Sequence, residues 1–268
     1  MKIAILGCGP AGMFAAHAAA SEFGICSKED LVIYSKPRKS FMRGAQYLHR
    51  AIPGLSGNSF EVEYKLEGTV DGYRTKVYGD TSDVLVSPET LVGTAPVWDI
   101  REAYDRAWEL YQGHILQVNL LDQGQNFYNN LVDNFDMVIS TVPADVICQN
   151  DEHKFWSERV WVTDFIKTEG KFESRDNLVI CSGDPEDWWY RQSRIHGWEN
   201  TEFPAKNKPN APEGHLWYVE KPIRTDCNCH PEIHREGRYG RWQKGVLSHE
   251  AFFNTDRKIT AQLQGWQA

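Results

Sequence analysis

The order of apolar and polar positions predicts a βαβ unit at the start of the chain. "KIAIL" (residues 2–6) is a short apolar run of strand-forming residues, and "LVIY" (31–34) is a second one. A helix is expected over 10–23, because Pro10 is tolerated in a first turn and the following alanines allow close packing on a sheet. Strand, helix and strand together have the length of one βαβ unit.

Beyond residue 60 the pattern changes. "FEVEYKLEG", "YRTKVYGD" and "VLVSPETLV" alternate apolar and polar residues between 60 and 92, which predicts an inserted antiparallel sheet. "WDIREAYDRAWELYQ" (98–112) has apolar residues at helical spacing, and Asp99 is suited to cap that helix. Further strands are predicted over 115–121, 135–143, 159–168, 177–185 and 215–223, and a terminal helix over 245–263.

These elements predict an α/β fold with a discontinuous division of the chain. A doubly wound, parallel, Rossmann-like sheet is expected to carry an inserted antiparallel β (α+β) substrate domain. The nucleotide-binding domain is predicted to comprise residues 1–60, 98–150, 176–200 and 235–268. The substrate domain is predicted to comprise residues 61–97, 151–175 and 201–234.

Composition and charge limit the function classes. The chain has 268 residues and a net charge of −8, so nucleic-acid binding is not expected. Residues 1–50 nevertheless hold seven basic and three acidic side chains, which favours a small phosphate-bearing ligand. The six cysteines are predicted to be mostly reduced thiols of a cytoplasmic protein. No apolar run approaches the ~20 residues that cross a bilayer, so no membrane association is expected.

A glycine-rich turn follows the first predicted strand. In Gly7-x-Gly9-x-x-Gly12 the first glycine allows a tight turn, and the second lets backbone amides approach a pyrophosphate. The third lets the helix lie close to the strand. Because a strand precedes the motif and an alanine-rich helix follows it, the motif indicates a dinucleotide site.

The segment after the second strand departs from the usual dinucleotide pattern. An acid normally binds the ribose there, whereas this chain has Ser35, Lys36, Arg38 and Lys39. Basic residues at this place often bind the 2′-phosphate of NADP, which keeps an NADP-dependent reductase as an alternative. A solvated basic loop is the other alternative.

Five stretches resemble a known group of flavoproteins. "AILGCGPAGMFAAHAA" followed by "GAQYLH" resembles the FAD-binding start of the glutathione-reductase and amine-oxidase superfamily. "FDMVISTVP" and "NLVICSGDP" resemble later strands of that superfamily. "GRYGRWQKGVLSHEAF" (237–252) resembles the Gly-Arg segment near the C-terminus of UDP-galactopyranose mutase, where a loop meets the flavin.

The resemblance implies FAD as cofactor and a set of contact residues. The implied FAD-binding residues are Gly7, Gly9, Pro10, Ala11, Gly12, Ser35, Lys36, Arg38, Arg43, Gly44, Ala45, Gln46, Val118, Thr141, Arg238, Trp242, Gly245, Val246 and Leu247. Two departures matter: the ribose acid is missing, and the chain is short for the superfamily. The paired tyrosines of the mutase are replaced by Trp242 and Lys244, so mutase activity is not carried over.

Two groups of residues are candidates for substrate chemistry. "DPEDWWYRQSRIHGW" (184–198) offers Tyr190, Arg191 and Arg194 to receive an anionic group, and Tyr47 is assigned to the same substrate site. The tryptophans of this stretch are equally suited to a core or a dimer contact. His49 is the candidate general acid or base beside the flavin.

"DCNCHPEIH" (226–234) is a possible but non-standard metal motif. Cys227, Cys229, His230 and His234 are all residue types that bind zinc, yet the spacing is not that of a known finger. A buried turn with free thiols and no metal is therefore the preferred interpretation.

The sequence thus predicts an FAD-dependent oxidoreductase that acts on a small amine or alcohol, and it leaves a homodimer open. That substrate could be anionic, or linked to a nucleotide or sugar. Besides the NADP-dependent reductase, the alternatives are a non-redox flavoenzyme of the sugar-mutase type and a non-catalytic nucleotide-binding protein.

Overall fold

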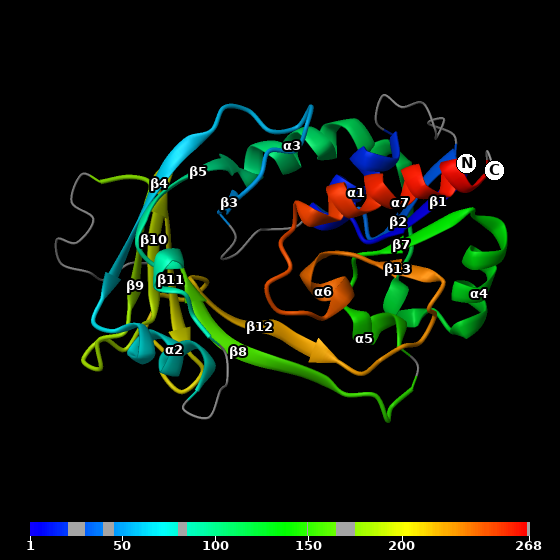
Figure 1. The fold of residues 1–268 in the computed structure, drawn as a ribbon. Helices are drawn as coiled ribbons and strands as arrows, with labels where there is room; N and C mark the ends of the chain where they lie inside the picture. Colours follow the sequence, from blue (N-terminus) through cyan, green and yellow to red (C-terminus); the bar gives the residue numbers. More distant parts are fainter. Residues whose placement is uncertain (21–29, 40–45, 80–84, 149, 165–174, 267–268) are drawn as a thin grey trace.

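A computed structural model describes residues 1–20, 30–39, 46–79, 85–148, 150–164 and 175–266 (Figure 1). Within these residues the strands form a five-stranded sheet and an eight-stranded sheet. The two sheets lie in different parts of the molecule, and the chain passes between them several times. This confirms the predicted α/β fold with a parallel nucleotide-type sheet and a second, mostly antiparallel part.

The five-stranded sheet is parallel throughout. Its order is β13 (Ile233–Arg235), β7 (Met137–Ser140), β1 (Ile3–Leu6), β2 (Leu31–Ser35) and β6 (Ile115–Gln117). β1 is central, and it pairs in register with β2 on one side and with β7 on the other. The strand predicted over 2–6 therefore becomes the middle of the sheet.

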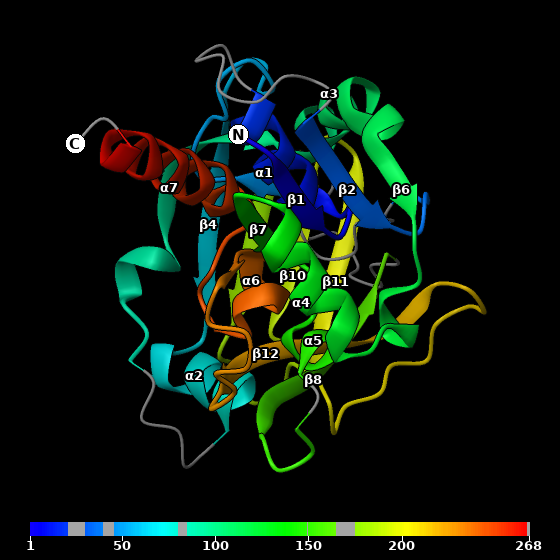
Figure 2. The ribbon, with the colours of Figure 1, turned by 90° about the vertical axis from the view of Figure 1, so that its right-hand side faces the viewer.

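Helices cover both faces of this sheet, because alternate side chains of a strand point to opposite faces. Ile3 and Ile5 of β1 pack beneath α1 (Pro10–Ala20), α3 (Ile100–Tyr111) and α7 (Glu250–Trp266). Ala4 and Leu6 face α4 (Gln125–Asn134) and α5 (Ala144–Ile147). Figure 2 shows the two groups of helices around β1 and β7.

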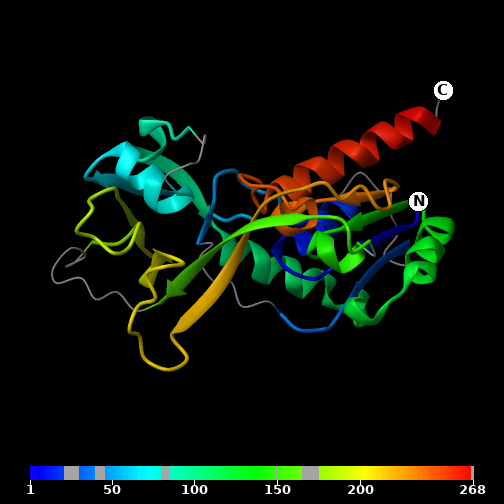
Figure 3. The ribbon, with the colours of Figure 1, turned by 90° about the horizontal axis from the view of Figure 1, so that it is seen from below.

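The eight-stranded sheet is curled and mixed. Its order is β12 (Leu216–Thr225), β8 (Phe155–Thr163), β11 (Trp198–Pro204), β10 (Arg191–Ile195), β9 (Leu178–Ser182), β4 (Phe60–Glu67), β5 (Gly93–Asp99) and β3 (Tyr47–Leu48). β4 and β9 pair in parallel, and the other neighbours are antiparallel. Figure 3 shows β8 and β12 running from this sheet towards the part that holds β1.

One segment predicted as a strand is a helix. Residues 70–78 form α2 (Val70–Tyr78), because the Thr69 hydroxyl accepts a hydrogen bond from the backbone NH of Gly72 and caps the first turn. The segment VLVSPETLV (84–92) was also predicted as a strand. Among its described residues, 85–92, the regular structure is the short 3-10 turn η2 (Pro88–Thr90), which precedes β5. Two further 3-10 turns, η3 (Gln112–His114) and η4 (Leu120–Asp122), flank β6.

Strand pairing decides which sheet each strand joins. Residues 176–200 are expected from the sequence in the nucleotide-binding domain, and β9 and β10 within this range lie in the eight-stranded sheet, because β9 pairs with β4. Conversely, β13 extends the parallel sheet by pairing with β7. The predicted cap at Asp99 is confirmed, since its carboxylate accepts a hydrogen bond of 2.7 Å from the backbone NH of Arg101.

The terminal segments join the two parts. α6 (Gly237–Arg241) follows β13, and the next residues return to the second sheet. The indole NH of Trp242 donates to the Trp156 carbonyl over 3.0 Å, and the Lys244 NH donates to the Ile223 carbonyl over 3.0 Å. α7 begins at Glu250, later than the predicted 245. Within the described residues no helix has both the length and the apolar character to cross a membrane.

Candidate active site

The glycine-rich turn lies at the carboxyl end of β1. Gly7 has a φ of +99°, a conformation that side chains disfavour, and its NH donates to the Tyr34 carbonyl over 3.0 Å. A Cβ on Gly12 would lie 2.0 Å from the Gly7 carbonyl oxygen. The first turn of α1 therefore rests directly on the strand-to-helix turn, which leaves the amino end of the helix at the edge of the sheet.

The end of β7 closes one side of this turn. The Thr141 hydroxyl donates to the Leu6 carbonyl over 2.9 Å. That hydroxyl would stand 2.9 Å from a Cβ placed on either Gly7 or Gly12. Thr141, which the resemblance assigns to the cofactor, is thus brought to the glycine-rich turn.

The segment before α7 lies on the same turn. A Cβ on Gly237 would lie 2.7 Å from the Cβ of Ala11, and one on Gly240 would lie 2.6 Å from the Ser140 carbonyl oxygen. The NH of Glu236 donates to that same carbonyl over 2.8 Å. Residues more than two hundred positions from the start of the chain therefore contact the first helix.

The basic segment after β2 lies beside the turn. The Cys8 thiol donates to the carbonyls of Lys36 and Arg38 over 3.3 and 3.6 Å, while the side chains of both residues are exposed. Lys39 is also exposed and forms an ion pair with Asp105. Its charge is therefore partly compensated, whereas Lys36 and Arg38 present theirs to solvent.

Two other assigned residues meet at the same edge of the sheet. The backbone NH of Val118, just beyond β6, donates to the Ser35 carbonyl over 3.1 Å. Ser35 ends β2, at the position where an acid would normally bind a ribose. The structure therefore brings Ser35 and Val118 together at the place expected for an adenosine.

Other assigned residues are engaged elsewhere. Gln46 is 4% exposed; its carbonyl accepts from the Ser193 hydroxyl over 2.5 Å, and its amide donates to the Trp198 carbonyl over 3.1 Å.

The side chain of Trp242 is buried against the second sheet. Gly245 is exposed, Val246 is buried and the Leu247 NH donates to Glu250. Arg43, Gly44 and Ala45 lie outside the described residues.

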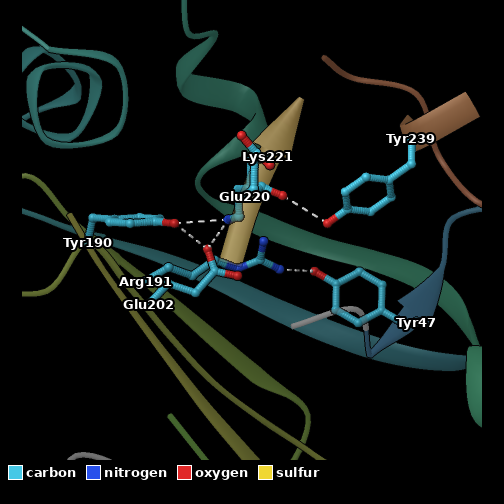
Figure 4. Close-up of polar contacts among 7 residues, drawn as sticks. All are labelled: Tyr47, Tyr190, Arg191, Glu202, Glu220, Lys221 and Tyr239. Carbon is cyan, nitrogen blue, oxygen red and sulfur yellow. Dashed lines mark hydrogen bonds and ion pairs between the residues drawn. The ribbon is translucent and has the colours of Figure 1, made fainter. Parts of the chain in front are cut away.

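A polar cluster lies on the second sheet (Figure 4). The hydroxyl of Tyr47 accepts hydrogen bonds from Arg191 Nη2 over 3.1 Å and from the Tyr64 hydroxyl over 3.0 Å. The Nε of Arg191 is buried and has no hydrogen-bond partner among the described residues. The cluster therefore contains one buried N–H donor that the described residues leave unsatisfied.

Glu202 is the buried acid of this cluster. It is 3% exposed, and Oε2 accepts from the Tyr190 hydroxyl and from Lys221 Nζ, each over 2.5 Å. Burial alone would raise the pKa of Glu202, but the charges of Lys221 and Arg191 outweigh it and hold that pKa at about 2. Glu202 is therefore ionised throughout the neutral range.

Two residues predicted to meet an anionic substrate do not join Arg191. Tyr190 is 2% exposed and its hydroxyl is bonded to Glu202, so it supports the buried acid. Arg194 pairs across the sheet with Leu178, whereas Arg191 pairs with Cys181. Because residues three apart on a strand point to opposite faces, the two arginines do not converge.

His49 lies at the edge of the cluster. Its ring is edge-on to Tyr47, with centroids 5.3 Å apart. Desolvation of the ring, and then the positive charge of Arg191, lower the pKa of His49 below its ordinary value. The imidazole is therefore neutral at neutral pH and able to accept a proton.

Sequence reasoning missed several members of this region. Glu202 and Lys221 come from separate strands and have no motif, so only strand pairing brings them together. The Tyr239 hydroxyl donates to the Glu220 carbonyl over 2.9 Å and ties α6 to β12. The adjacent charged pair Glu220 and Lys221 inside an apolar strand was the available signal, and it does not identify a partner.

The predicted set of metal-binding residues divides in the structure. His230 packs on Tyr128, with its Nδ1 3.4 Å from the amide nitrogen of Gln125, and His234 lies in β13. Cys227 and Cys229 are brought instead to residues at the end of α5 and before β8.

No protein-family model matches the sequence, and no curated protein matches it. Solved structures do match the fold. A reduced UDP-galactopyranose mutase aligns with a TM-score of 0.60 at 13% identity, over 98% of this chain and 94% of that one. A p-nitrophenol 4-monooxygenase of Pseudomonas putida aligns with a TM-score of 0.54 at 13% identity, over 97% and 78%. A tryptophan C-6 flavin-dependent halogenase from taromycin biosynthesis aligns with a TM-score of 0.50 at 10% identity, over 98% and 71%. At these identities the likeness shows the fold, which is of the flavoprotein type.

Proposed function

We propose that this protein is an FAD-dependent enzyme that holds the dinucleotide on the Gly7–Gly12 turn. The proposal rests on the close contact between Gly237 and Ala11. Gly237 begins the segment 237–252 that resembles the flavin-contacting loop of the mutase, and this contact brings the segment onto the dinucleotide turn. The flavoprotein-type fold supports the same cofactor.

The residues at the edge of the parallel sheet fit the ADP half of FAD. The amino end of α1 offers backbone NH groups to a pyrophosphate, and the glycines keep side chains out of that approach. Ser35 takes the ribose in place of the missing acid. Lys36 and Arg38 add positive charge near the phosphates, whereas the carboxylate usual in this segment would not add positive charge.

The polar cluster of the second sheet fits the substrate side. When bound, FAD supplies an acceptor for a hydride from the substrate carbon. Arg191 supplies the positive charge that attracts a small anionic substrate, and Tyr47 fixes the guanidinium. His49, neutral at working pH, takes the proton of an amine or alcohol. The proposed reaction is therefore an oxidation of a small anionic amine or alcohol.

A second candidate is a non-redox flavoenzyme of the sugar-mutase type. The match to the reduced mutase over nearly the whole of both chains favours it. The replacement of the tyrosine pair by Trp242 and Lys244 counts against it, because the Trp242 indole is bound to the second sheet.

The cofactor is tested by spectroscopy and titration. The full chain, purified without added nucleotide, should show flavin absorbance, or should quench FAD fluorescence with a Kd below tens of micromolar (roughly −6 kcal/mol). NADPH is titrated in parallel. A colourless protein that binds NADPH but not FAD would replace the proposal with the reductase alternative.

The reaction class is tested with the reconstituted protein. Bleaching of the flavin under anaerobic conditions, on addition of a panel of small anionic amines and alcohols, supports the oxidase. Turnover of a sugar nucleotide only after chemical reduction, with no net consumption of reductant, supports the mutase type.

A further inference from the structure

Four metal-binding side chains converge away from the site described above. Cys148, His153, Cys227 and Cys229 each offer one ligand atom, and these four atoms lie within 4.8 Å of one another. All four side chains are partly buried. Cys148 follows α5, His153 precedes β8, and the other two cysteines lie between β12 and β13.

The separations match those of ligands around a single tetrahedral ion. With Zn–S bonds of about 2.3 Å and Zn–N bonds of about 2.0 Å, two sulfurs lie about 3.8 Å apart, and a sulfur and a nitrogen about 3.5 Å apart. The Sγ atoms of Cys148 and Cys229 are 3.8 Å apart. His153 Nδ1 lies 3.2 Å from the first sulfur and 3.5 Å from the second.

The backbone around the cluster is held independently of any ion. Antiparallel pairing of β8 with β12 places Phe155 opposite Thr225, so the turns before and after them are neighbours. The Lys154 NH donates to the Asp226 carboxylate over 2.7 Å, and the Thr225 hydroxyl donates to the Lys154 carbonyl over 2.8 Å. The histidine and the later cysteines are therefore positioned before an ion binds.

Groups outside the four side chains complete the arrangement. Arg235 donates to Cys227 Sγ over 3.2 Å, and to the carbonyls of Cys227 and Cys229 over 3.1 and 2.8 Å. Its charge offsets the excess of negative charge that three thiolates leave on a divalent ion. Such outer contacts orient the ligands of natural metal sites.

We propose that Cys148, His153, Cys227 and Cys229 bind one structural zinc ion. Three thiolates and one imidazole in a tetrahedron are a ligand set that zinc prefers. Because the four protein ligands fill the coordination sphere, the ion serves structure rather than catalysis. It links the end of α5, in the parallel-sheet part, to the joined ends of β8 and β12 in the second sheet.

The first test is the metal content of the full chain, purified with its affinity tag removed and without chelator. Elemental analysis should find one zinc ion per chain. Cys148→Ser and Cys229→Ser should each lose most of the zinc. His234→Gln is the matched control, because that histidine belongs to the same sequence motif but lies outside the cluster, and it should retain zinc.

The second test does not depend on a variant folding. A thiol-blocking mercurial should release zinc from the wild-type protein as thiols are titrated. Replacement by Co²⁺ should give the visible bands of tetrahedral cobalt with sulfur-to-metal charge transfer. A chelator should lower the thermal midpoint.

Three results would overturn the proposal. The first is that reduced wild-type protein holds no zinc and gives no tetrahedral spectrum with Co²⁺, and the second is that it holds iron in place of zinc. The third is a disulfide between Cys148 and Cys229 in peptide mass spectra of protein purified with reductant.

Discussion

Gly237 and Ala11 approach so closely that a Cβ on the glycine would stand 2.7 Å from the Cβ of the alanine. Gly237 also has a φ of +72°, which glycine adopts at little cost. The contact joins the segment before the last helix to the first turn of the first helix. No side chain larger than hydrogen fits there without moving one of the two segments.

Gly237→Ala should therefore weaken FAD binding by about tenfold or more, equal to about 1.4 kcal/mol, because α6 must shift off α1. Fluorescence titration of the apoprotein measures this change. Gly214→Ala is the matched control, since Gly214 has a φ of +80° but open space around its Cβ position. Equal FAD affinity in both variants would show that α6 does not shape the cofactor site.

Neutralising Lys36 and Arg38 together should weaken FAD binding about fivefold at low ionic strength. The loss should shrink towards 1 M salt, where the Debye length is about 3 Å. Lys39→Ala should have a smaller effect, because Asp105 already compensates that charge. Titrations at several salt concentrations measure the slope. If the double variant keeps FAD but loses a separate affinity for NADPH, the segment serves a second nucleotide.

Arg191→Gln should raise the pKa of His49, since removing a nearby positive charge favours the imidazolium. NMR titration of the histidine ring signals, assigned with His49→Gln, measures it. Arg194→Gln provides the control, because that residue points to the opposite face of β10 and should leave the His49 titration unchanged. Identical His49 titration curves for both variants would show that the charge of Arg191 does not act on the proposed base.

Glu202 should make stability depend on pH in acid. Its pKa is about 2 in the folded protein against an ordinary 4.5, so its stabilising contribution is present above pH 4.5 and is lost as the pH falls towards 2. Glu202→Gln should therefore destabilise the protein by about 3 kcal/mol at neutral pH and by progressively less in acid. Denaturant unfolding across this range gives the slope.

Tyr190→Phe is the control for this prediction, because it removes one hydrogen bond to Glu202 but no charge. It should lower the free energy of unfolding at all pH values while keeping most of the dependence of that free energy on pH. A Glu202→Gln protein whose acid sensitivity matches that of wild type would show that other carboxylates dominate.

Local patterns predicted the elements whose cause is local. The apolar runs of 2–6 and 31–34 became β1 and β2, and the cap at Asp99 began α3 where expected. Residues 70–78 were missed because the cap at Thr69 outweighed a short alternation of apolar and polar residues. Local alternation over so few residues does not distinguish a strand from one face of a helix.

The grouping of side chains from distant segments was not predictable in the same way. Tyr190, Arg191 and Arg194 are close in sequence, yet strand geometry sends the two arginines to opposite faces. Cys227 and Cys229 were considered with their sequence neighbours His230 and His234, whereas the fold brings them to Cys148 and His153. A sequence motif shows which residue types are close along the chain, and strand pairing decides which of them meet in the structure.

The sequence by itself determined the βαβ start, the glycine-rich turn at its centre and the absence of an acid after β2, because each depends on residues a few positions apart. Tertiary structure alone decided that Gly237 rests on Ala11, that Glu202 is buried against Lys221, and that three cysteines and a histidine converge. The physical reason is that these contacts depend on how β8, β12 and β13 pair. Pairing is set by burial over the whole chain and not by any short stretch.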